Sequence, residues 1–217
     1  MGGMTQPPST PDNQNPLLTD WTGPFGLPPL GAIKPEHFRP TFDRALTAHR
    51  AEIDAISANP AVPSFHNTIE ALERSGHDLD RISNVFFVLA GAATSDAIEA
   101  VEREISPLLA RHSNTLYLDR ALYSRIAALH GRRDSLGLNA EQARVLDRYH
   151  TRFVRAGAAL DKPAQDRLAA INERLASLGT QFGQNVLADE KAYALVLEEG
   201  DLAGLPNFAR AAARAAA

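Results

Sequence analysis

Histidine and carboxylate side chains are the groups in this chain that could bind a metal ion or transfer protons. Cysteine is absent, which removes thiolate ligands and a cysteine nucleophile. Histidines are never closer than 11 positions in the sequence, so no helical turn carries the two histidines of an HExxH zinc motif. We interpret them as ordinary surface or core residues, with a site assembled from distant histidines as the alternative. The seven are His37, His49, His66, His77, His112, His130 and His150.

Two pairs of acids could in principle serve acid–base chemistry, namely Glu102 with Glu104 and Glu198 with Glu199. Acids in helices and turns are usually solvated charges, and we interpret both pairs in that way. The sequence also lacks the GxSxG, GxxxxGK[ST] and GxGxxG patterns that position a serine nucleophile or a phosphate group. We therefore predict no catalytic, no cofactor-binding and no metal-binding residue in this chain.

The charge composition indicates which kinds of molecule this protein is expected to bind. The 217 residues carry a formal net charge of -4 with an isoelectric point near 6.0, and the arginines are scattered among acids. We therefore expect neither a nucleic acid nor an anionic membrane as a partner. No apolar run approaches the roughly 18 residues that cross a bilayer, and the N-terminus lacks the regions of a signal peptide. Together with the absence of cysteine, this favours a soluble protein of the cytoplasm.

The stretch from Phe65 to Thr94 is predicted to be a long α-helix, because its apolar and small residues recur three and four positions apart. We expect the other helices of the domain to pack around it. Asn67 and Glu70 are predicted to form a capping box at its start. A continuous apolar run over residues 85–89 predicts burial among other helices. We interpret Gly76 as a close helix crossing, with a break into two helices as the alternative. The pattern consists of Ile69, Leu72, Gly76, Leu79, Ile82, Phe86, Leu89 and Ala93.

Elements on either side of this stretch complete the predicted fold. Helices are expected at residues 35–58, 96–116, 119–130, 139–160 and 161–189. Residues 1–14 are expected to be a disordered tail, and residues 15–34 an irregular arm rich in proline, glycine and apolar side chains. Residues 193–197, YALVL, have the pattern of a strand. We predict an all-α fold, a multi-helix bundle of long antiparallel helices with an irregular N-terminal arm and one short strand near the C-terminus.

Several segments, in the same order, resemble the N-terminal region of the thimet-oligopeptidase family of zinc metallopeptidases. They include IKPEHFRPTFDRAL, FHNTIEALERSG, VFFVLAGAAT, RFVRAGAALD and RLAAINERLASLGTQFGQNVLAD. The similarity covers about residues 15–206, and within the family it is greatest to the bacterial peptidyl-dipeptidase branch, followed by oligopeptidase A.

The resemblance implies that residues 35–217 are the helical N-terminal domain of a truncated peptidase. Members of the family hold zinc through two histidines of an HExxH helix and a later glutamate, and none of these positions occurs here. The parent protein is therefore expected to hold zinc and to remove C-terminal dipeptides from short peptides. This chain alone is expected to hold no zinc and to be inactive. Its implied role is to wall the substrate channel and to restrict it to short peptides.

The expected partners are short peptides, for the parent protein, and the missing catalytic domain. Without that domain, apolar residues of the arm such as Trp21, Phe25 and Leu27 would lose part of their cover, as would the YALVL strand. Self-association of the fragment is therefore a further expectation. The alternative interpretation is a free-standing helical binding or scaffold protein without the peptidase half.

Overall fold

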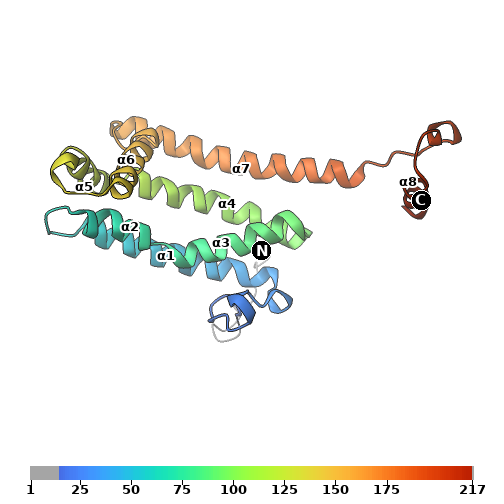
Figure 1. The fold of residues 1–217 in the computed structure, drawn as a ribbon, viewed down its shortest axis with the longest axis horizontal. Coiled ribbons are helices and arrows are strands. Elements are labelled where there is room, and N and C mark those ends of the chain that lie inside the picture. Colours follow the sequence, from blue (N-terminus) through green and yellow to red (C-terminus); the bar gives the residue numbers. More distant parts are fainter. Residues whose placement is uncertain (1–14, 217) are drawn as a thin grey trace, which may run out of the picture. The chain divides into compact units, whose positions relative to one another are not determined.

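The computed structural model describes residues 15–216, and helices make up most of them (Figure 1). The α-helices are α1 (Pro35–Ser57), α2 (Ala71–Arg74), α3 (His77–Ala92), α4 (Asp96–Tyr117), α5 (Arg120–His130), α6 (Ala140–Arg155), α7 (Lys162–Ala192) and α8 (Asn207–Ala216). Shorter helical turns are η2 (Pro24–Gly26), η3 (Leu30–Ala32), η4 (Phe65–Glu70), η5 (Arg133–Ser135) and η6 (Glu199–Leu202). The predicted all-α fold class is confirmed. The tail predicted at residues 1–14 lies outside the described residues.

Two compact units divide the chain, one ending at residue 181 and the other beginning at residue 182. The first contains α1 to α6 and most of α7, and the second contains the end of α7, η6 and α8. In the second unit, the guanidinium group of Arg210 donates to the carbonyl oxygens of Leu202 and Leu205 at 2.6 and 3.0 Å. Among the described helices, none combines the length and the apolar character needed to cross a membrane.

The first apolar core of the larger unit lies among α1, α3 and α4. The ring of Phe86 on α3 meets the rings of Phe38 and Phe42 on α1 edge to face, with centroids 4.9 and 5.6 Å apart. All three side chains are fully buried. The arm is anchored to α1 by the buried Asn15, whose amide nitrogen donates to Oγ1 of Thr41 at 2.9 Å. Aromatic packing therefore joins α1 to α3, and a buried amide fixes the start of the arm.

A second core lies where the end of α1 meets α5, α6 and the segment formed by η4 and α2. Local caps set the start of two of these helices, because Asp119 accepts from the first backbone N–H groups of α5, and Asn139 with Gln142 forms a capping box on α6. Both starts confirm the prediction from spacing. The fully buried side chains of this core are Ile53, Ile69, Leu122, Ile126, Leu129, Leu146 and Phe153.

The prediction of a single long helix over residues 65–94 is wrong, because the helix is interrupted at Gly76, between α2 and α3. Gly76 has a φ of 76°, in the left-handed region that residues with a Cβ adopt at a cost. A Cβ at this position would lie 2.9 Å from Cε1 of His49 on α1, so the neighbouring helix also excludes a larger residue. The alternative interpretation of Gly76 is therefore confirmed, since two helices are joined at this glycine.

The start of this stretch also differs from the prediction. The capping box joins Ser64 and Asn67, not Asn67 and Glu70, and the turn that follows is π-helical. Oδ1 of Asn67 accepts from the backbone N–H of Ser64 at 2.8 Å and from Nη2 of the buried Arg125 on α5 at 2.9 Å. A residue distant in the sequence therefore holds the capping side chain, which explains why local spacing predicted the wrong pair.

Two further expectations about apolar segments are wrong. Within residues 85–89, Phe87 and Val88 are 43% and 64% exposed, so this run is not surrounded by other helices in the described chain. The strand predicted at residues 193–197 is a segment without regular secondary structure, and Val196 within it is 83% exposed. A strand needs a neighbour to accept and donate its backbone hydrogen bonds, and the described residues provide none.

Helix α7 turns its apolar stripe away from α4. Its opposite side contacts α4 through polar groups, because Asn172 and Thr180 donate to side-chain oxygens of α4 at 2.7 and 2.8 Å. On the apolar side, Ile171, Leu175 and Leu178 are 38%, 60% and 40% exposed. The most regular apolar pattern of the sequence therefore lies on the surface of the described residues.

Candidate functional site

The fold brings together histidines that are far apart in the sequence. His49 on α1 and His112 on α4 share a hydrogen bond of 2.9 Å between Nδ1 and Nε2. The rings of His130 and His150, on α5 and α6, stack with centroids 3.9 Å apart and an interplanar angle of 5°. Within the described part of the chain, no group of three or more histidine or carboxylate side chains is arranged to hold a metal ion. The distant histidines pair, but these pairs do not make a metal centre.

The remaining histidines take structural or surface positions. Nδ1 of His37 accepts from the backbone N–H of Lys34 at 3.0 Å, which caps the start of α1. His66 lies on the surface, with Nδ1 2.7 Å from the carboxylate of Glu70. His77 is exposed at the start of α3. None of these three side chains belongs to a cluster that could bind a metal ion or carry out catalysis.

The two acid pairs do not form a site either. Glu104 is exposed and accepts from Nη1 of Arg39 at 3.0 Å, while Glu102 is half-buried on the same helix. Glu198 and Glu199 are exposed in the smaller unit, at the start of η6. The exposed pair is open to solvent, which is the environment of a solvated surface charge.

The half-buried pair of His49 and His112 lies beside the turn at Gly76. Burial lowers the pKa of His49, and burial with the neighbouring charges of His49 and Arg50 lowers the pKa of His112 to about 4. Both rings are therefore neutral near pH 7, so that one N–H donates to a lone pair of the other. Oγ of Ser75 lies 3.4 Å from Nε2 of His49, but it donates to a carbonyl oxygen of α2 at 2.8 Å. The arrangement is a structural contact between α1 and α4.

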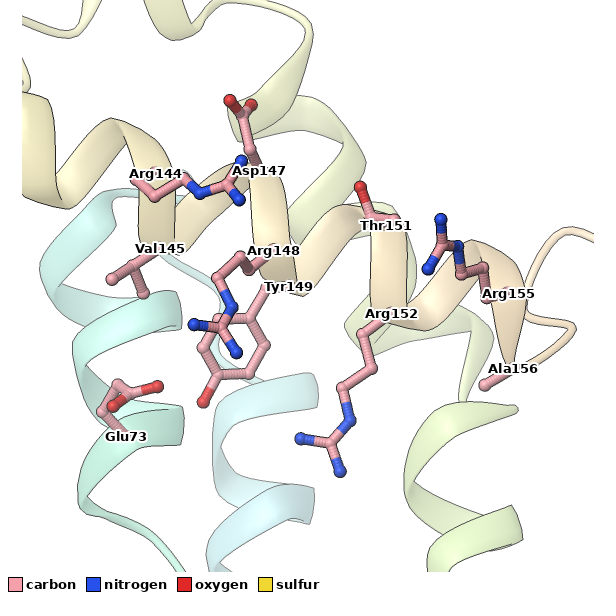
Figure 2. Close-up of a pocket in the computed structure, with 10 residues that line it drawn as sticks. All are labelled: Glu73, Arg144, Val145, Asp147, Arg148, Tyr149, Thr151, Arg152, Arg155 and Ala156. Carbon is pink, nitrogen blue, oxygen red and sulfur yellow. The ribbon is translucent and has the colours of Figure 1, made fainter.

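A groove of about 1000 Å³ lies between α6 and α2, and charged side chains of α6 form most of its lining (Figure 2). We call it the α6 groove. Arg144, Arg148, Arg152 and Arg155 are spaced by four, four and three positions, which places them on one side of the helix. Figure 2 shows Arg148 and Arg152 extending from α6 on the same side as Tyr149. The other lining residues are Glu73, Val145, Asp147, Tyr149, Thr151 and Ala156.

Both acids of the α6 groove lie beside other side chains of the protein. Burial and the neighbouring carboxylate of Glu73 raise the pKa of Tyr149 above its ordinary value. Oδ1 of Asp147 lies 3.2 Å from Nε2 of His130 on α5. The two carboxylates keep their charges, but the four arginines that line the groove outnumber them.

The arginines of the α6 groove are mostly unpaired. The guanidinium group of Arg152 lies over the ring of Tyr117, 4.7 Å from its centroid, which is a cation–π contact. Within the described residues, Arg144, Arg148 and Arg155 make no hydrogen bond and no ion pair. All four side chains are exposed. The groove therefore presents several guanidinium groups that could bind an anion.

The sequence analysis does not predict this site, because arginines scattered among acids along the chain indicate no basic surface. The spacing of Arg144, Arg148, Arg152 and Arg155 was the available signal, since it predicts one helical face. The same spacing also occurs on solvated faces, so it does not predict a groove. The position of Glu73 beside Tyr149 depends on how α2 packs and does not follow from the sequence.

Known proteins similar to this chain are peptidases. The chain is 41% identical over 192 residues to the dipeptidyl carboxypeptidase of Escherichia coli (strain K12), a match that covers 88% of this chain and 28% of that protein. It is 42% identical over 204 residues to the dipeptidyl carboxypeptidase of Salmonella typhimurium, covering 93% and 30%. Oligopeptidase A of Salmonella typhimurium is 33% identical over 204 residues, covering 94% and 29%. No family model matches the chain.

The chain spans about 30% of the length of the curated relatives it matches, and it resembles their N-terminal region. The resemblance predicted from the ordered sequence segments is confirmed. The matched part includes nearly the whole of this chain, so the helices described above are the shared region.

Proposed function

We propose that this chain, whose homologues are dipeptidyl carboxypeptidases and oligopeptidases A of the thimet-oligopeptidase family, is the non-catalytic N-terminal helical part of such a zinc peptidase. Its role is to form a wall of the substrate channel and to restrict the channel to short peptides. The observation that carries this proposal is the 41–42% identity over about 90% of this chain, matched to only about 30% of each relative.

The exposed stripe of α7 supports an assembly with further protein. Apolar residues at helical spacing normally face a core, yet Ile171, Leu175 and Leu178 lie on the surface of the described residues. Contiguous exposed apolar side chains mark surfaces that another protein part covers. In the proposed peptidase, the catalytic part packs on this stripe and buries it.

Zinc belongs to the full-length peptidase in this proposal and not to this chain. Catalytic zinc is usually held by three protein ligands with one open position. The described residues bring histidines together only in pairs, and the parallel rings of His130 and His150 cannot direct their in-plane lone pairs at one ion. The described residues do not fit the metal, so we assign no step of peptide hydrolysis to them.

The proposal is tested by reading the coding sequence beyond codon 217 and expressing the longest product. We expect a reading frame that includes an HExxH helix, a product with about one zinc ion per chain, and hydrolysis of short blocked peptides. Replacing the glutamate of that motif by glutamine is the inactive control. Folded proteins should not be cleaved if the channel admits only short peptides.

The chain of 217 residues, purified alone, should neither retain stoichiometric zinc after dialysis nor hydrolyse the same peptides. Hydrolysis that follows this protein through purification would contradict the non-catalytic role. A reading frame that stops at codon 217 would instead favour the alternative, a free-standing helical binding or scaffold protein.

A further inference from the structure

The α6 groove has the length of a short extended peptide. Arg144 and Arg155 are 11 positions apart on one helix, which separates their Cα atoms by about 16 Å along the axis. An extended peptide advances about 3.3 Å per residue, so about five residues would span this distance. A single phosphate or carboxylate group would reach only one or two of the guanidinium groups, because it is much shorter than the row.

The charge within the groove is unbalanced in favour of the arginines. Its lining contains four arginines and two acids, Glu73 and Asp147. The guanidinium groups of the unpaired arginines are planar forks that can donate two parallel hydrogen bonds to one carboxylate. Because they have no partner in the described residues, an incoming carboxylate would not have to displace an existing ion pair.

We propose that the α6 groove binds an extended acidic peptide segment, whose carboxylates pair with Arg144, Arg148 and Arg155 while its backbone lies along α6. A single-stranded nucleic acid has a similar length and charge, but its bases need exposed aromatic rings for stacking. Among the residues that line the groove, the aromatic one is Tyr149, which is half-buried.

This inference stands on residues of this chain and does not depend on the proposed peptidase. Where both hold, the groove gives the peptidase a preference for peptides with acidic stretches. Exposed arginine–carboxylate pairs each contribute modestly, so we expect weak binding, with a Kd on the order of 100 μM at low ionic strength. Salt should weaken it strongly, because these charges are solvent-exposed.

The test uses fluorescence anisotropy of labelled hexaglutamate with the full chain, and labelled hexaglutamine as the uncharged probe of equal length. Hexaglutamate should bind at about 0.02 M salt and be released at about 0.5 M, whereas hexaglutamine should not bind. Inorganic phosphate should compete only at concentrations far above those of unlabelled hexaglutamate. Labelled hexauridylate serves as the probe for nucleic acid, and we expect it to bind less tightly than hexaglutamate.

Matched arginine variants separate the groove from overall charge. R148Q/R155Q should weaken hexaglutamate binding about tenfold, because two pairs of up to about 1 kcal/mol each are lost. R167Q/R174Q on α7 removes the same charge from two other exposed, unpaired arginines and should change binding less than about twofold. R148K/R155K keeps the charge but not the planar forks, so its affinity should fall between the wild type and R148Q/R155Q.

Several outcomes would overturn the proposal. Equal binding of hexaglutamate and hexaglutamine by the wild-type chain would exclude carboxylate recognition, whether or not the variants fold. Equal weakening by the two glutamine double variants, each with an unchanged circular dichroism spectrum, would show attraction by net charge alone. Tighter binding of hexauridylate than of hexaglutamate would assign the groove to nucleic acid.

Discussion

Replacing Gly76 by alanine should distinguish a broken helix from a continuous one by the sign of the stability change. Gly76 has a φ of 76°, and an L-residue in the left-handed region costs about 1–2 kcal/mol. The added Cβ would also lie 2.9 to 3.0 Å from three atoms of the His49 ring, closer than ordinary contact. Overpacking of this kind costs about 1–3 kcal/mol. Gly76→Ala should therefore lower the free energy of unfolding by about 2–5 kcal/mol.

A continuous helix would respond in the opposite direction. Alanine is favoured over glycine in a helix interior by about 1 kcal/mol, so the same replacement would then stabilise the protein. Urea unfolding followed by far-UV circular dichroism measures the difference. Gly91→Ala in α3 is the matched control, since a Cβ at Gly91 meets nothing within 4 Å, and it should leave stability unchanged or raise it by up to about 1 kcal/mol.

A double-mutant cycle with His49→Ala separates the two costs of Gly76→Ala. Without the His49 ring the clash disappears, and only the backbone cost of about 1–2 kcal/mol should remain. Equal destabilisation with and without the ring would refute the contact between Gly76 and α1. A Gly76→Ala protein at least as stable as the wild type would refute the break between α2 and α3.

Three further outcomes are expected. His112 has a pKa of about 4 in the folded chain and an ordinary value near 6.5 when unfolded, so its contribution to stability is complete above about pH 6.5 and is lost as the pH falls toward 4. His112→Asn should flatten this decline in urea midpoints, and an unchanged pH profile would contradict it. Ser64→Ala removes the cap on η4 and should cost about 1 kcal/mol of unfolding free energy, so a neutral result in the same assay would count against that cap. Leu175→Gln should change the stability of the chain by less than about 0.5 kcal/mol, because Leu175 is 60% exposed. The same replacement should weaken co-purification with the catalytic part of the proposed peptidase, and full retention would argue against the α7 stripe as the contact.

Local chemistry in the sequence determines where several helices begin and end. Asp119 caps α5 and Asn139 caps α6, as their spacing predicts, because each cap bonds backbone N–H groups no more than three residues away. Helical periodicity likewise predicts α1 and α7 with bounds close to those observed. The all-α fold class and the resemblance to the peptidases therefore follow from the sequence alone.

Contacts between helices decide two features that the local spacing of residues does not predict, the capping partner of Asn67 and the conformation at Gly76. Asn67 satisfies the pattern of a cap toward Glu70, but Arg125, 58 positions away, holds its side chain in the box with Ser64. Gly76 fits both a helix crossing and a break, since glycine can adopt the helical and the left-handed conformation. The structure has the break, and His49 packs against it.

The same distinction applies to the surfaces proposed for function. The stripe of α7 has the same spacing whether or not a partner covers it, so only the positions of the other helices reveal that Leu175 is exposed. The row from Arg144 to Arg155 follows from sequence spacing, but the α6 groove and the positions of its acids depend on α2 and α5. The sequence determined the helices and their faces, and the tertiary structure decided which faces stay open to a ligand, because burial and pairing arise only when the helices pack.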